Sequence, residues 1–476
     1  MGNSSNQRTA NKWLAVSVAL ALVLAIAAIS FFLLRVDSRR ALSMRLPGGD
    51  GRPAEPDVSD EPVKLTGTLE KFNDLKKSAA AGDSWPWFRG RNLSNIYNGE
   101  VKPARKWPEG GPKVLWSIDL GEGYAGGAVN NGCVYVVDYD QQKKMDSIRC
   151  FSFEDGSEIW RYSYPVRIKR NHGMSRTVPA VTDKYIVALG PMCHLTCLDA
   201  ITGEFKWMYN LVREFGTKVP LWYAGQCPFI EDGKVIIAPA GDDVLMMSID
   251  CATGEIAWKT PNPNKWEMTH TSIMPMEFAG KKMYVYCGSG GVTGVNAEDG
   301  SIVWETKEWK LRTNIPSPVH VGEGVILLCA GYGKGSMMLK LNDSDGEITA
   351  EPVFTLEPEV FGSEQHTPLF YDGHIYGVRA DWQMACMDLD GNIVWTSTSQ
   401  HSFKKLGPYM IADGLMYIMD GSGKLTMAEA GPTGYTQLDE AKVLDGIESW
   451  APMAMVSGKL IVRDFTRMVC LDVSQH

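Results

Sequence analysis

The phrase Leu198-Asp-Ala-Ile-Thr-Gly-Glu-Phe-Lys-Trp207 returns several times along this chain of 476 residues. It reads again as Ile249-Asp-Cys-Ala-Thr-Gly-Glu-Ile-Ala-Trp258, and weaker copies end at Trp160, Trp304 and Trp395. Trp160, Trp207, Trp258 and Trp304 follow one another at 47, 51 and 46 residues, and Trp395 comes two such periods later. A period of about 40–50 residues is typical of repeat architectures in which each unit is one supersecondary structure.

A second marker gives the number of repeats. Each unit carries a turn residue, usually glycine, followed by a run rich in Val, Ile or Tyr, and eight such copies are present. Asp-Gly and Thr-Gly pairs then precede the tryptophans and indicate tight hairpins. Proline is tolerated at the start of a strand but not inside a central one, so the prolines that recur upstream of the turn mark the entry of an inner strand. These prolines are Pro228, Pro275, Pro318, Pro368, Pro408 and Pro452.

Four short antiparallel strands in each unit of about 45 residues are typical of a propeller blade. The sequence therefore predicts an all-β protein, a closed eight-bladed β-propeller of four-stranded antiparallel blades. We expect the recurring tryptophans to be structural, because a large indole at a fixed place in each unit can fill the space between neighbouring blades. The set of blade-docking residues is Trp116, Trp160, Trp207, Trp258, Trp304 and Trp395.

The two ends of the repeat region complement each other. The last unit, Ser449 to Val473, has three strands and lacks its outer one, whereas Val114–Leu120 reads as an outer strand without its own blade. Joining them completes the eighth blade and removes two open sheet edges, which otherwise favour aggregation.

The segment before the ring divides into four parts. Residues 1–13 are an N-terminal flank, and Leu14 to Leu34 is an uncharged apolar stretch long enough to span a bilayer as a transmembrane anchor. A cleaved signal peptide is the alternative. Residues 35–84 are expected to be a partly disordered linker, with a short helix considered for Gly67 to Ala81. Residues 85–112, which begin with an aromatic cluster, are expected to be a strap packed on the ring formed by 113–476; an aromatic ligand clamp is the alternative.

Composition narrows the function classes. The net charge of −9 argues against a nucleic-acid surface. Of the ten cysteines, Cys150, Cys197, Cys386 and Cys470 occupy equivalent positions in different blades, which are too far apart for disulfides. Most of the cysteines are therefore interpreted as small buried hydrophobes. The chain contains no recognisable nucleophile motif, phosphate loop or zinc-binding cluster, so neither a catalytic residue nor a metal ligand is assigned. A closed ring is expected to be monomeric.

The phrase Asp-Ala-x-Thr-Gly-Glu-x-x-Trp resembles the tryptophan-docking motif of pyrroloquinoline-quinone-like β-propellers, over about 360 of the 476 residues. That superfamily holds quinoprotein alcohol dehydrogenases and the propeller lipoprotein of the outer-membrane β-barrel assembly machinery. The resemblance to exported propellers implies a ring outside the cytoplasm, in the periplasm or an equivalent space. The arginines after the apolar stretch lean the other way, toward a cytoplasmic C-terminus.

Two classes of function follow from this resemblance. The enzyme class implies pyrroloquinoline quinone, calcium and a disulfide between adjacent cysteines, and this chain has no Cys-Cys pair. The other class needs only a closed ring with exposed loops and a membrane tether. The sequence therefore favours a membrane-tethered extracytoplasmic scaffold that binds an envelope protein and needs no cofactor. A quinone-dependent dehydrogenase and a propeller that binds small ligands or polysaccharide are the alternatives.

Polar and aromatic residues just before the inner strands form the candidate binding site. The connections between blades are expected to meet at the mouth of the axial channel, where repeated polar groups can form a pocket. The alternative is that they hydrogen-bond neighbouring loops and channel water. The candidates are Arg176, Trp222, Gln226, His270, Arg312, Asn314, Gln365, His366 and Trp450, with His172 and Thr271 beside them.

Overall fold

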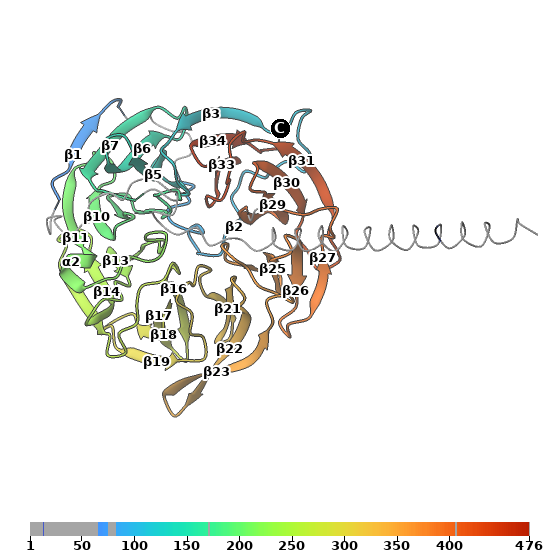
Figure 1. Cartoon of the computed structure of the whole chain (residues 1–476). Coiled ribbons are helices and arrows are strands. Elements are labelled where there is room, and N and C mark those ends of the chain that lie inside the picture. The colour runs from blue at the N-terminus through green and yellow to red at the C-terminus, as the bar shows by residue number, and fades with distance from the viewer. Residues whose placement is uncertain (1–12, 14–64, 75–81, 170–171, 405–406, 476) are drawn as a thin grey trace, which may run out of the picture.

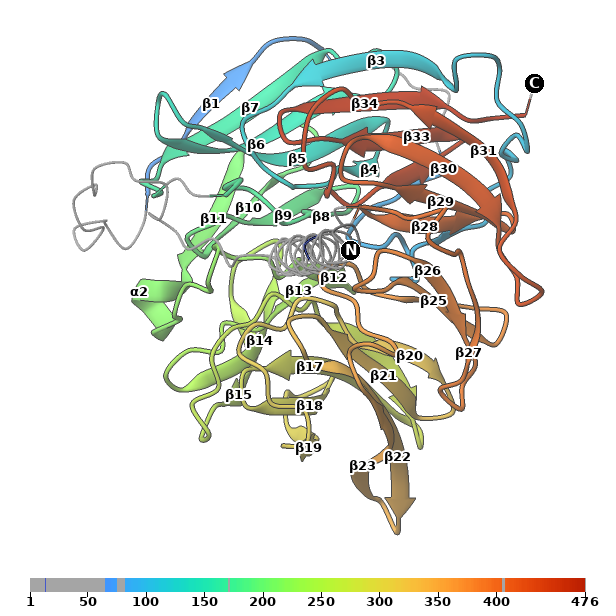
Figure 2. The ribbon, with the colours of Figure 1, turned by 45° about the vertical axis from the view of Figure 1, so that its right-hand side comes forward.

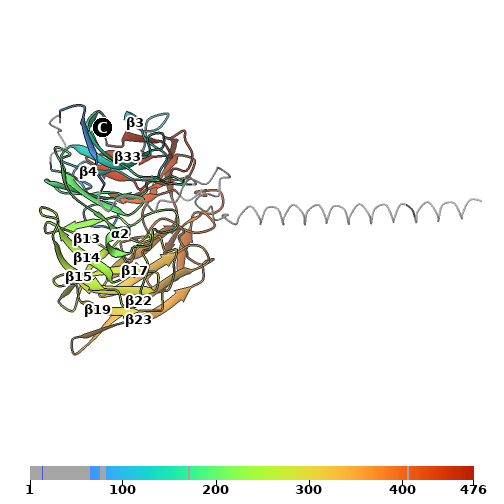
Figure 3. The same cartoon turned by 60° about the vertical axis from the view of Figure 1, so that its left-hand side comes forward.

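The computed structural model describes residues 13, 65–74, 82–169, 172–404 and 407–475. Figure 1 shows eight sheets arranged as a ring around a central axis. Figure 3, a view closer to the edge of the ring, shows that the blades form a single layer. The fold is therefore an eight-bladed β-propeller, as the repeats predicted.

Each blade has four antiparallel strands that follow one another from the inside of the ring outward. Blades 1 to 4 are formed by β4 (Ala128–Asn130), β5 (Cys133–Asp140), β6 (Met145–Ser152) and β7 (Glu158–Pro165); β8 (Ala180–Val181), β9 (Tyr185–Leu189), β10 (His194–Asp199) and β11 (Phe205–Asn210); β12 (Phe229–Glu231), β13 (Lys234–Ile237), β14 (Val244–Asp250) and β15 (Ile256–Pro261); and β16 (Met274–Phe278), β17 (Lys281–Gly288), β18 (Gly291–Asn296) and β19 (Ile302–Thr306).

Blades 5 to 8 repeat this order and close the ring. They are formed by β20 (Val319–Gly322), β21 (Val325–Ala330), β22 (Gly335–Ser344) and β23 (Glu347–Leu356); β24 (Leu369–Tyr371), β25 (His374–Val378), β26 (Met384–Met387) and β27 (Ile393–Thr396); β28 (Tyr409–Ala412), β29 (Leu415–Met419), β30 (Lys424–Glu429) and β31 (Gln437–Lys442); and β32 (Ala454–Val456), β33 (Lys459–Arg463), β34 (Arg467–Asp472) and β3 (Lys113–Asp119).

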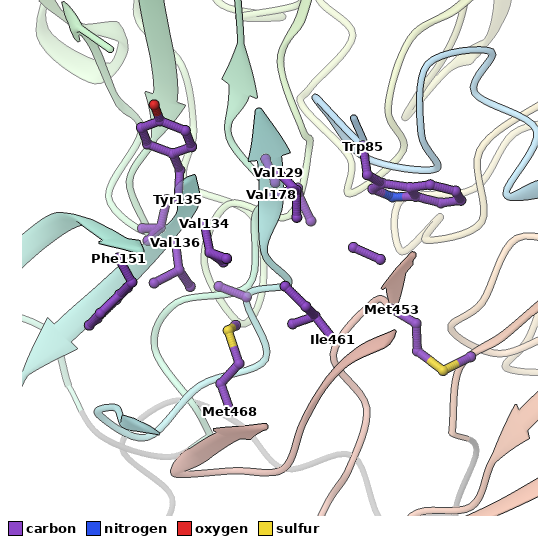
Figure 4. Packing of buried hydrophobic residues seen from close by; sticks show 14 of the residues in the cluster. Trp85, Val129, Val134, Tyr135, Val136, Phe151, Val178, Met453, Ile461 and Met468 are labelled. Carbon is purple, nitrogen blue, oxygen red and sulfur yellow. The ribbon is translucent and has the colours of Figure 1, made fainter. Parts of the chain in front are cut away.

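The closing strand lies where the sequence placed it. β3 pairs with β34 in antiparallel register, from Lys113 opposite Asp472 to Asp119 opposite Arg467. The N-terminal and C-terminal parts of the ring thus share blade 8, and β34 is covered by β3 instead of being left as an open edge. Figure 4 shows the packing between blade 8 and blade 1, where Val134 of β5 lies near Ile461 and Met468 of blade 8.

Two further strands extend the sheets beyond four. β1 (Thr68–Lys71) pairs with β7 on the outside of blade 1, and β2 (Ile96–Tyr97) runs parallel to β28. The short helix considered for Gly67 to Ala81 is therefore wrong at its start, where the chain is extended. The physical reason is that β7 offers unpaired backbone groups at the blade edge, and β1 satisfies them.

The docking tryptophans join each blade to the next. Four indole N–H groups donate to a backbone carbonyl of the following blade, at 2.9–3.2 Å. The pairs are Trp116 with Phe153, Trp207 with Cys251, Trp258 with Ala297 and Trp395 with Gly431.

Two tryptophans depart from this pattern, and the outer strands of blades 5 and 7 contain no tryptophan. Trp160 packs on Gly203 of blade 2, and its indole nitrogen has no acceptor in the described chain. Trp304 turns its N–H to the sulfur of Met283 in its own blade, at 3.2 Å. In blade 5, which lacks the tryptophan, Phe354 packs on Gly391 of blade 6. A phenyl ring thus fills the place that the sequence left vacant.

The remaining features concern the cysteines, the helices and the outline of the ring. All ten cysteines are buried and free. Among the described residues, no helix has the length and apolar character needed to cross a membrane; the stretch Leu14 to Leu34 lies outside them. A five-residue helix, α2 (Leu211–Phe215), follows β11. The β22–β23 hairpin projects beyond the other blades (Figure 2).

Candidate functional site

The N-terminal strap crosses the axial channel and closes one end of it. Trp85 forms a two-way backbone bridge with Val129 of β4, and the N–H of Val181 donates to Pro86 at 2.8 Å. Farther along the strap, Arg89 donates to the carbonyls of Thr367 and Pro368 just before β24 of blade 6, and β2 pairs with β28 of blade 7. Blade 6 lies across the ring from blade 2, so the strap residues between these contacts lie across the channel.

Arg89 fixes the strap in this position. Its guanidinium donates to four backbone carbonyls, two in the strap and two, of Thr367 and Pro368, just before β24. Burial lowers the pKa of Arg89 to about 10, a value at which the side chain is still charged at neutral pH. Four carbonyl acceptors compensate part of the cost of burying this charge. The strap expected for residues 85–112 is therefore present on the ring over its first part.

Above the strap lies a cavity, here called the cup. The space open to the centre of a water-sized sphere is about 170 Å³. Phe88 of the strap lines it, and the other lining residues come from the ring. These are Tyr124, His172, Arg176, Trp222, Gly225, Cys227, His270, Ser272, Ile315, Tyr332, Gln365, His366, Trp450 and Pro452.

Six of the nine candidates from the sequence line the cup. They are Arg176, Trp222, His270, Gln365, His366 and Trp450, and His172 joins them. The connections between blades bring them together because each one leads from an outer strand back to the next inner strand on the same face of the ring.

The other three candidates do not line the cup. Gln226 is fully buried and bonds the backbone of Ala238 through both ends of its amide, at 2.8 and 3.2 Å. Asn314 is buried, and its backbone carbonyl accepts from the backbone N–H of His270. Arg312 has a side chain that is 81% exposed and forms an ion pair with Glu267 at 3.1 Å. The hydrogen bonds of Gln226 and Asn314 correspond to the alternative of loop fixation.

Two aromatic residues of the cup were missed in the sequence. Tyr332 lies between β21 and β22, within one blade, whereas the candidates from the sequence all precede inner strands in the connections between blades. Its signal was the sequence Gly331-Tyr-Gly-Lys, an aromatic residue inside a glycine-rich turn. Tyr124 lies just after β3 and carried no marker beyond the glycines around it.

Aromatic rings form most of the wall. Trp222 stacks on His270, with centroids 6.0 Å apart and planes at 25°, and lies 5.8 Å from Tyr332. Trp450 lies 5.1 Å from Tyr124. Trp222 and its neighbour Tyr223 both have positive φ, at 65° and 76°. Residues with side chains rarely adopt this backbone conformation, and where they do it often accompanies a functional site.

Burial sets the charges of the cup. It lowers the pKa of His270 to about 3, with Arg176 adding to the effect, so this imidazole is neutral at pH 7. Burial, followed by the charge of Glu448, raises the pKa of Tyr124 well above its usual value. The Tyr124 hydroxyl donates to Glu448 at 2.6 Å. Arg176 lines the cup with its guanidinium over the ring of Tyr124, 5.4 Å from the centroid.

The lining residues do not fit the calcium and quinone that the dehydrogenase resemblance implies. Calcium takes about 6–8 oxygen ligands, usually with several carboxylates, and no Asp or Glu lines the cup. Cys227 is the one cysteine there, so an adjacent-cysteine disulfide has no counterpart. Within the described ranges no group of three or more His, Cys, Asp or Glu residues is arranged to hold a metal ion.

Comparisons with known proteins agree on the repeat and the fold. Residues 144–353 match the family model described as outer membrane protein assembly factor BamB. BamB from Moraxella catarrhalis is 14% identical, with a TM-score of 0.52 over 76% of this chain and 99% of that one. A europium-containing methanol dehydrogenase is 11% identical, with a TM-score of 0.59 over 80% of this chain and 89% of that one. No curated protein matches the sequence. At these identities the two structures show the shared fold alone.

Proposed function

We propose that this chain, which is similar to pyrroloquinoline-quinone-like β-propellers, is a protein-binding scaffold of the cell envelope. The observation that carries this proposal is the match of residues 144–353 to an outer membrane protein assembly factor. A propeller of that kind acts through the surfaces of its loops, since the blades themselves are occupied in packing against one another.

The geometry of the cup supports a binding role. One end of the channel is closed by the strap, so partners reach the cup from the opposite face. We call Trp450, Tyr332 and Ile447 the rim: Trp450 and Tyr332 line the cup, and Ile447 lies three residues before Trp450 in the same connection between blades. Tyr332 and Ile447 are 38% and 60% exposed. Aromatic residues and arginine are enriched among the residues that dominate binding energy at protein interfaces.

Tethering to a membrane is part of the proposal. Leu14 to Leu34 contains 21 uncharged residues, which at about 1.5 Å per residue matches the roughly 30 Å of a bilayer core. We propose that this stretch is a single-pass anchor and that the ring lies outside the cytoplasm, as a monomer. The resemblance to exported propellers supports this orientation.

Photo-crosslinking in native membranes tests the scaffold. A photoreactive amino acid is placed at Tyr332 or Ile447 on the rim. The control position is Val353 on the outer strand β23, whose exposure of 59% is close to the 60% of Ile447. We expect a discrete adduct with one partner from both rim positions and none from Val353. Equal labelling from all three positions, or none from the rim, contradicts the proposal.

The alternative of a quinone-dependent dehydrogenase has a direct test. The purified full-length protein is incubated with pyrroloquinoline quinone and calcium, and dye-linked oxidation of alcohols and sugars is measured. We expect no turnover above that of the quinone alone, because the cup lacks the carboxylates that a calcium site needs. Turnover that depends on the protein refutes the scaffold as the main function.

A further inference from the structure

Arg176 is a cation of the cup whose hydrogen-bonding groups are only partly satisfied. Its Nη2 donates to the carbonyl of Gly173 at 2.8 Å. Its Nε is buried and meets no acceptor within the described chain. A buried N–H of a charged group without an acceptor is costly. The site is therefore suited to an acceptor that enters the cup from outside.

The charges around Arg176 leave its positive charge uncompensated. Glu448 bonds the hydroxyl of Tyr124, and no ion pair joins it to Arg176 in the described structure. Burial lowers the pKa of Arg176, and the groups that raise it are tyrosines rather than carboxylates. Arg176 is also the one Lys or Arg among the lining residues, none of which is acidic. These observations point to an anionic ligand with one charged group.

The side chains that line the cup indicate the chemical character of the uncharged part of the ligand. Trp222, Tyr332 and Trp450 present aromatic surface, and Phe88 of the strap closes the floor. Such walls suit an apolar or aromatic body. Arginine recognises the planar carboxylate group especially well because its donors are held in a fork.

We propose that the cup binds a carboxylate carried on an apolar or aromatic group, with Arg176 paired to the carboxylate and Trp222 and Trp450 enclosing the group. This inference rests on the proposed function, in which partners reach the cup from the face of the ring opposite the strap. A free organic acid and the C-terminal residue of a partner polypeptide share this chemistry. Because the strap closes the floor, a chain end can enter the cup but a chain cannot thread through it.

Calorimetric titration of the purified full-length protein tests the charge of the ligand. The probes are 3-phenylpropionate and its neutral amide, 3-phenylpropionamide, and a short peptide ending in phenylalanine as the free acid and as the amide. We expect each acid to bind about tenfold or more tightly than its amide, from the loss of charge-assisted hydrogen bonds. Acid and amide of equal affinity, or no binding of any acid, overturns the proposal without the use of a variant.

Matched variants test the place of binding. Arg176→Met should weaken binding of the acid about tenfold or more. Arg312→Met, which removes the same charge from an exposed side chain that does not line the cup, should leave binding unchanged. Arg176→Lys keeps the positive charge and replaces the Met variant in this test if that variant does not fold. The Lys variant should bind the acid more weakly than the unaltered protein, because an ammonium lacks the planar pair of donors that arginine offers to a carboxylate. Equal losses from Arg176→Met and Arg312→Met overturn the site.

The two pairs of probes distinguish a free organic acid from the C-terminus of a polypeptide. Together with the crosslinks, they also distinguish failure of the carboxylate site from failure of the scaffold function. Binding of 3-phenylpropionate but not of the peptide acid assigns the cup to free organic acids and rejects the polypeptide terminus. Preference for glucuronate over 3-phenylpropionate rejects the apolar body. If no acid binds while the rim crosslinks in membranes persist, the scaffold stands and the carboxylate site falls.

Discussion

Replacing Trp207 by alanine tests whether the tryptophans hold the blades together. Trp207 lies in β11 of blade 2, is 8% exposed, and donates its indole N–H to the carbonyl of Cys251 in blade 3 at 2.9 Å. Its ring also covers the turn at Gly254, where an added Cβ would lie 2.7 Å from the indole Cγ. One side chain thus supplies apolar contact and a hydrogen bond across the same interface.

These contacts give the expected magnitude. Truncation of a buried large aromatic residue to alanine costs about 3–5 kcal/mol. The hydrogen bond accounts for about 1–2 kcal/mol of this, because its loss leaves the Cys251 carbonyl without its donor. Trp207→Phe keeps most of the ring and should therefore cost about 1–2 kcal/mol, whereas Trp207→Ala should cost the full amount.

Urea unfolding of the full-length chain, followed by far-ultraviolet circular dichroism, measures these costs. Lys206→Ala on the same strand is the control, because its ion pair with Asp199, at 3.9 Å and partly exposed, should contribute at most about 1 kcal/mol. A cost below about 1 kcal/mol for Trp207→Ala, or equal costs for the alanine and phenylalanine variants, refutes the docking role.

Three further predictions concern closure, pH and topology. Deleting Val114–Leu120 should lower the melting temperature and increase aggregation, because β34 then becomes an open edge; an unchanged melting curve contradicts ring closure. Burial raises the pKa of Asp146 to about 7 from 3.8, so stability should fall as the pH rises from about 4 to 7, and Asp146→Asn should abolish this fall in pH-dependent urea unfolding. The same fall in both proteins would assign it to other groups. A reporter that works only in the periplasm, fused after His476, should be active, whereas activity of a cytoplasm-only reporter reverses the proposed topology.

The repeat could be predicted from the sequence because each of its signals is local. In the turn between β14 and β15, the carboxylate of Asp250 accepts from the N–H of Thr253 at 2.9 Å, and Gly254 has a positive φ of 76°. Consecutive residues are sufficient to specify such a turn. Counting the turns then gave the number of blades, and the missing outer strand of the last unit indicated closure by Val114–Leu120.

The positions of the strap and of β1 could not be predicted from the sequence, because they depend on contacts between residues that are distant in the chain. Arg89 bonds Thr367, 278 positions away in the chain, and β1 pairs with a strand about 90 residues later. No local pattern indicates such partners, because the strap is held by backbone carbonyls, which every residue has. For the same reason the phenyl ring of Phe354 in the vacant docking position carried no signal in the sequence.

The candidate site also has a part that the local sequence determined and a part that the tertiary structure decided. The sequence alone determined an eight-bladed ring and which connections reach the channel mouth, since alternation and turn residues fix the path of each blade. Only the tertiary structure decided which side chains enter the cup: Trp222 turns inward on a backbone with positive φ, whereas Gln226, four residues later, is used to fix the loop. The direction of a loop side chain depends on the packing of its neighbours from other blades, and that packing exists only in the closed ring.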